Sequence, residues 1–110
     1  MKIKFYLSTS GRSPVEEFIA DASLEIRHKF FDAVSLLAQG KALAMPLSRN
    51  LSSIHPGLHE LRLKDRTGQV RVFYFMKKQD AIYIVHGIRK KTRRIPDKDI
   101  QLMLKRLKEV

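Results

Sequence analysis

Four stretches of the chain show either alternation of apolar and polar residues or a short apolar run, and these patterns predict four β-strands. The expected strands cover residues 2–8, 58–63, 69–76 and 81–88. Short polar turns at 66–68 and 78–80 separate the last three strands. We expect these three strands to pair as an antiparallel meander, and the first strand to lie at a sheet edge.

Three further segments have the spacing and end signals of helices. Apolar residues at helical spacing predict a helix over 22–39, which Gly40 ends. A shorter helix is expected to begin at Ser13, where serine, proline and Glu16 fit a capping box. A last amphipathic helix is expected to open at Pro96.

The element order is therefore β-α-α-β-β-β-α, which predicts one α+β domain over residues 1–110. We expect a small antiparallel twisted sheet with the two N-terminal helices on one face. The other face would then be left for function. Residues 44–57 are read as a connector, because Pro, Ser and Gly are enriched there.

Charge narrows the range of partners. Lys and Arg number 22 against 11 acidic residues, for a formal net charge of +11, and 15 of these cations follow residue 59. Such a balance favours a polyanion such as RNA or DNA. The chain has no cysteine, which excludes disulfides and thiolate metal sites. No signal peptide or membrane-spanning run is visible, so we expect a cytoplasmic protein without a membrane partner.

Polar residues interrupt the predicted strands at a few positions. Alternation places Glu60, Arg62 and Lys64 on one strand face. Arg71 interrupts the apolar run QVRVFYFM, where a core strand would carry an aliphatic residue. His86 comes near the end of the last strand, just before the basic stretch IRKKTRRIP.

These groups match the needs of metal-free RNA cleavage. The ribose 2′-hydroxyl must lose a proton, the phosphorane needs fixed cations, and the leaving 5′ oxygen must gain a proton. Arg62 and Arg71 suit the second task, because guanidinium groups bind phosphate bidentately. Glu60, His86 or a lysine are alternatives for the base, and His86 or Tyr74 for the acid. Glu60 has a further reading, in which it only orients the two arginines.

The candidate catalytic residues are Glu60, Arg62, Arg71, His86, Lys90 and Lys91. The candidate nucleic-acid-binding residues are Lys64, Arg66, Tyr74, Arg89, Thr92, Arg93 and Arg94. No histidine has metal-ligand spacing, so we expect neither a metal nor another cofactor.

The strings GLHELRL, QVRVFYF and IVHGIRKKTRRIP, followed by a basic C-terminal helix, resemble the phage-derived HigB branch of the RelE/ParE toxin superfamily. The resemblance covers nearly the whole chain. Its motifs match residues 57–62, 71–74 and 90–96. One departure is Ile88, where that branch commonly has phenylalanine, and another is the additional charge of Arg93 and Arg94.

The resemblance implies a RelE-like fold and the toxin of a type II toxin–antitoxin pair. Most relatives of this kind are ribosome-dependent mRNA endonucleases that need no metal. The resemblance implies mRNA and the ribosome as partners, together with a cognate antitoxin of the HigA-like helix-turn-helix kind. It also implies that the RNA-contacting or catalytic cations beside Glu60 are Arg62, Arg71, Lys90 and Lys91. Two other function classes stay open: a ParE-like inhibitor of DNA gyrase, and a non-catalytic nucleic-acid-binding module.

Overall fold

The computed structural model describes residues 1–77, 81–89 and 93–110. The predicted turn at 78–80 and residues 90–92 lie outside these ranges. The elements are β1 (Lys2–Phe5), α1 (Pro14–Ala20), α2 (Leu24–Ala38), β2 (Ser48–Asn50), β3 (Leu58–Asp65), β4 (Gly68–Lys77), β5 (Ala81–Arg89) and α3 (Asp97–Leu107).

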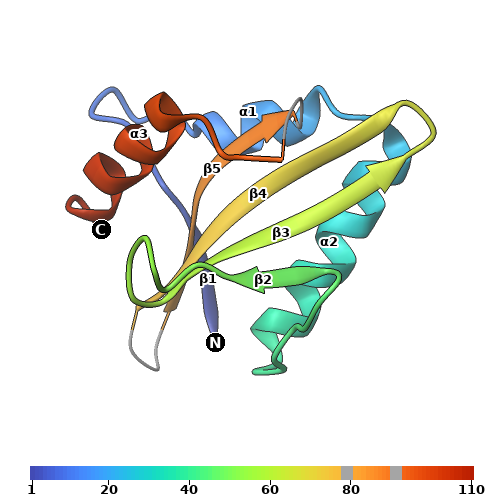
Figure 1. The fold of residues 1–110 in the computed structure, drawn as a ribbon, viewed down its shortest axis with the longest axis horizontal. Helices are drawn as coiled ribbons and strands as arrows, with labels where there is room; N and C mark the ends of the chain where they lie inside the picture. Colours follow the sequence, from blue (N-terminus) through green and yellow to red (C-terminus); the bar gives the residue numbers. More distant parts are fainter. Residues whose placement is uncertain (78–80, 90–92) are drawn as a thin grey trace.

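Within the described residues, five strands form one sheet in the order β1-β5-β4-β3-β2 (Figure 1). The predicted meander of β3, β4 and β5 is confirmed, and β1 lies at the edge as expected. β1 pairs with β5 in parallel, whereas the other neighbours are antiparallel. The α+β fold class is therefore confirmed, with a mixed and mostly antiparallel sheet.

Both faces of the sheet carry a hydrophobic core. On one face, α1 and α2 contribute Val15, Ile19, Ile26 and Phe30 to a cluster that includes Val72. On the other face, α3 covers part of the sheet, and its apolar side chains Met103 and Leu107 pack in a second cluster with Leu58, Phe73 and Val85. The expectation that this second face is left free was wrong, because the apolar stripe of α3 needs a surface to bury against.

Two local predictions were also wrong. β2 lies inside the segment that we read as a connector, and it pairs with residues 59–61 of β3. Ser13 precedes α1 and Pro14 opens it, but the Ser13 side chain makes no capping hydrogen bond. The serine that caps a helix is Ser23, whose hydroxyl accepts a bond from the Ile26 amide at 3.1 Å.

Candidate active site

A buried carboxylate joins two arginines on the α3 face of the sheet. Glu60 is 1% exposed, and its Oε1 accepts a hydrogen bond from Arg62 Nε at 2.8 Å. Its Oε2 lies 3.4 Å from Arg71 Nε. Arg62 and Arg71 are direct cross-strand neighbours of β3 and β4. Like charges at such positions repel, so the carboxylate between them offsets the repulsion and fixes both guanidinium groups.

The two arginines differ in exposure. The Arg62 side chain is 23% exposed, whereas that of Arg71 is 3% exposed. Arg71 Nη2 also donates a hydrogen bond to the backbone carbonyl of Arg93 at 2.9 Å. Arg62 is therefore the member of the pair that is open to solvent, while Arg71 links the sheet to the segment that follows β5.

The other predicted cations do not all lie with this cluster. Lys64, Arg66, Arg93 and Arg94 are exposed. Arg89 pairs in register with Val70, whose side chain belongs to the core under α1 and α2. The register therefore places Arg89 on the sheet face opposite to the cluster. The predicted residues Lys90, Lys91 and Thr92 lie outside the described residues.

His86 lies apart from the two arginines, in a polar contact between β5 and α3. Phe73 separates it from Glu60 in the cross-strand register. Arg106 Nη1 lies 3.2 Å from Nδ1, and since the guanidinium can only donate, Nε2 carries the hydrogen and donates to Asp99 Oδ1 at 2.8 Å. Burial lowers the pKa of His86; the Asp99 hydrogen bond opposes this, and the positive charge of Arg106 adds to it.

Tyr74 is not part of the cluster either. It is 1% exposed, and its ring packs in the core under α1 and α2. Its hydroxyl lies 2.6 Å from the hydroxyl of Ser48 in β2. Tyr74 therefore buttresses the sheet from the face opposite to the arginines.

A family model described as Phage derived protein Gp49-like (DUF891) matches residues 17–108. The chain belongs to this family. Gp49-like proteins are part of the RelE/HigB-like toxin group, so membership is consistent with the toxin of a toxin–antitoxin pair. No curated protein matches the chain.

An exposed cation near this cluster in the Gp49-like chain, Arg49, was not predicted from the sequence. Arg49 of β2 pairs in register with Glu60, and its neighbour Ser48 points into the opposite core. Alternation along the strand therefore places Arg49 on the same face as Glu60 and Arg62. Its signal was absent from the sequence, because the polar triplet that forms β2 has no alternation of its own.

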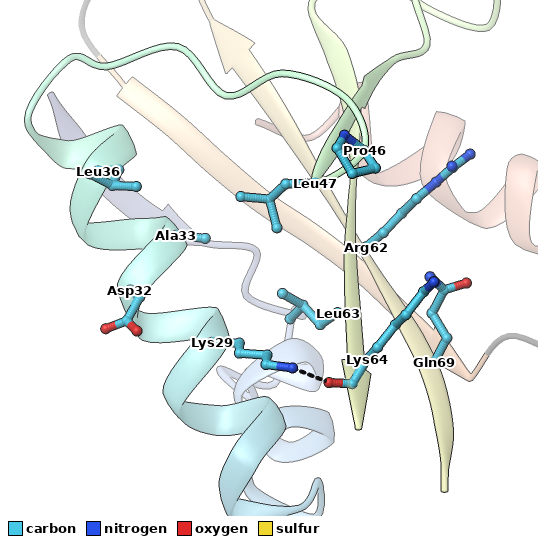
Figure 2. A pocket seen from close by; sticks show the side chains of 10 residues that line it. All are labelled: Lys29, Asp32, Ala33, Leu36, Pro46, Leu47, Arg62, Leu63, Lys64 and Gln69. Carbon is cyan, nitrogen blue, oxygen red and sulfur yellow. Dashed lines mark hydrogen bonds between the residues drawn. The ribbon is translucent and has the colours of Figure 1, made fainter. Parts of the chain in front are cut away.

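A pocket of about 470 Å³ lies beside this end of β3, between the strand and α2 (Figure 2). Leu47 and Leu63 point toward α2, whereas the Arg62 and Lys64 side chains extend away from it.

Within residues 1–77, 81–89 and 93–110, no cluster of His, Cys, Asp or Glu is arranged to hold a metal ion. None of the helices in those ranges is long and apolar enough to cross a membrane.

Proposed function

We propose that this Gp49-like chain is a ribosome-dependent mRNA endonuclease, the toxin of a type II toxin–antitoxin pair. The observation that carries the proposal is the Glu60 carboxylate, which holds Arg62 and Arg71 side by side at 2.8 Å and 3.4 Å. Two guanidinium groups fixed in this way form a preorganised anion site. The exposed Arg49 and Lys64 on the same sheet face and the net charge of +11 support RNA as the anion.

In the proposed reaction the ribose 2′-oxygen attacks the adjacent phosphorus and the bond to the 5′ oxygen breaks. A 2′,3′-cyclic phosphate forms on one product and a 5′-hydroxyl on the other. The partly exposed Arg62 binds the nonbridging oxygens, on which charge accumulates in the phosphorane. Glu60 acts as a positioning residue, because both of its oxygens face guanidinium groups.

The proton transfers need separate groups. Both oxygens of Glu60 face guanidinium groups, and both ring nitrogens of His86 face partners on α3. Lys90 and Lys91 follow β5 directly in the chain. We assign the proton transfers to this lysine pair, which the sequence resemblance implies only as RNA-contacting or catalytic cations.

We also propose a cognate antitoxin, of the HigA-like helix-turn-helix kind, as the protein that neutralises the chain. A toxin needs a partner that binds more tightly than its target does. The excess of positive charge favours acidic segments on that partner.

Induced expression in a bacterial host, followed within minutes by mapping of mRNA 5′ ends, tests the proposal. Wild type should arrest growth and create new ends inside translated codons. Arg62→Ala should abolish both, whereas Arg12→Ala, at an exposed arginine of the N-terminal region, is the matched control and should act like wild type. Growth arrest with intact mRNA would favour a ParE-like gyrase inhibitor, and no arrest would leave a nucleic-acid-binding module.

A further inference from the structure

The edge of β3 beyond Arg62 is open. β2 pairs with β3 only over residues 59–61, and one more backbone bond runs from the Arg62 amide to the Leu47 carbonyl at 2.8 Å. In the described part of the chain, no strand lies beside residues 63–65 on the side of β3 that β2 occupies. The backbone hydrogen bonds on this side of β3 therefore stop at Arg62.

The backbone groups of Lys64 face this open edge. Residues two apart on a strand point their backbone groups to the same side, so Lys64 follows Arg62, whose amide faces Leu47. The Lys64 carbonyl does face outward, since it accepts a hydrogen bond from Lys29 Nζ of α2 at 2.7 Å (Figure 2). The edge thus presents one backbone donor and one acceptor from the same residue, as a pairing strand requires.

The two sides of this edge differ in chemistry. On the α2 side lies the pocket of about 470 Å³, whose apolar lining comes from Ala33, Leu36, Pro46, Leu47 and Leu63. Arg62 and Lys64 also line the pocket, and their side chains extend away from α2 (Figure 2). A strand added here would place alternate side chains in the pocket and beside these two cations.

We propose that this edge binds an extended segment of a protein partner, in which acidic and apolar residues alternate. The apolar side chains fill the pocket against α2, and the acidic side chains pair with Arg62 and Lys64 across the added strand. The segment's backbone replaces Lys29 as the partner of the Lys64 carbonyl. An apolar pocket beside backbone donors and acceptors fits a peptide better than it fits RNA.

Occupation of this edge would also shield Arg62 from a phosphate, and this consequence alone rests on the proposed function. Peptide binding at the edge does not depend on the proposed function, so it is tested separately from RNA cleavage. The probe is an eight-residue peptide in which glutamate alternates with leucine, titrated into the ¹⁵N-labelled protein without RNA or ribosomes. Amide shifts should change at residues 63–65 and along α2, and the change should saturate.

Two substitutions at one position isolate the backbone contact. Lys64→Pro removes the outward N–H, and proline is tolerated at an unpaired edge. Lys64→Ala removes the same charge and side chain but keeps the N–H. We expect Lys64→Pro to bind the peptide about five- to tenfold more weakly than Lys64→Ala. Leu36→Glu, at a half-buried wall of the pocket, should also weaken binding, whereas Lys98→Glu on α3 should not.

Several outcomes would overturn the proposal. Shifts at β1, the strand at the opposite edge of the sheet, would move the strand site there. Equal affinity of the peptide for the Lys64→Pro and Lys64→Ala variants would exclude backbone pairing. Equally tight binding of a peptide that has lysine in place of glutamate would exclude charge pairing. Shifts at residues 63–65 with a single-stranded RNA but not with the peptide would assign the edge to nucleic acid.

Discussion

Replacing Glu60 by glutamine removes the charge that holds the two arginines and keeps the size of the side chain. Arg71 would then be left with a guanidinium that is 3% exposed and has lost its anionic neighbour. A buried charge that loses an anionic neighbour cannot recover its hydration, so the folded state alone is destabilised. We expect a large loss of stability from a change of one functional group.

The expected size follows from the geometry. At 3.4 Å and an effective dielectric constant of about 20, the gross attraction between Glu60 and Arg71 is about 5 kcal/mol. Removing one partner of a buried ion pair costs about 3–5 kcal/mol in other proteins. We expect Glu60→Gln to lower the free energy of unfolding by about that amount. Arg71→Met should cost less, because Glu60 then keeps Arg62 at 2.8 Å.

Urea denaturation of both single variants and of the double variant measures these terms. The double variant should be at least about 1.5 kcal/mol more stable than the sum of the single losses predicts, since both charges of the ion pair are then removed together. Arg62→Met serves as the control for exposure and should cost about 1 kcal/mol or less. A Glu60→Gln loss below about 1 kcal/mol, additive with Arg71→Met, would refute the role of the carboxylate as a structural anchor.

Three further predictions concern other parts of the chain. Burial lowers the pKa of His86 below its ordinary value of 6.5, so the stability conferred by the neutral ring is present above that pH and is lost as the pH falls below it. His86→Gln should therefore make the melting temperature depend less on pH in this acidic range. An unchanged pH dependence of the melting temperature would contradict this prediction. Gly87→Ala would place a methyl group 2.6 Å from the Phe18 ring and should cost about 1–3 kcal/mol in denaturation experiments, and an unchanged stability would contradict this close packing. Arg49→Ala should weaken binding of a single-stranded RNA and reduce the salt slope by about one, and an unchanged slope would remove Arg49 from the site.

The sequence predicted the centre of the site because strand alternation is a local property. Glu60 and Arg62 share a face two residues apart, and the ion pair between them confirms this. The short turn at 66–68 also determines the register, which pairs Arg62 with Arg71. The grouping of a carboxylate with two arginines could therefore be predicted from the chain alone.

Other parts of the site depend on tertiary contacts and could not be predicted. The pairing of β4 with β5 shifts between Phe73 and Tyr74, so that His86 faces α3 instead of following Ile84 into the opposite core. Such a bulge leaves no mark in the alternation of the strand. The partners of His86, Asp99 and Arg106, lie on a helix whose packing against the sheet was not expected.

The most direct test of the central claim is cleavage of an mRNA on purified ribosomes by the purified protein. We predict cuts within translated codons, with 2′,3′-cyclic phosphate and 5′-hydroxyl ends, and a loss of rate of about 10²-fold or more for Arg62→Ala. An mRNA that stays intact on translating ribosomes, or one that Arg62→Ala cuts as fast as wild type, would contradict the account.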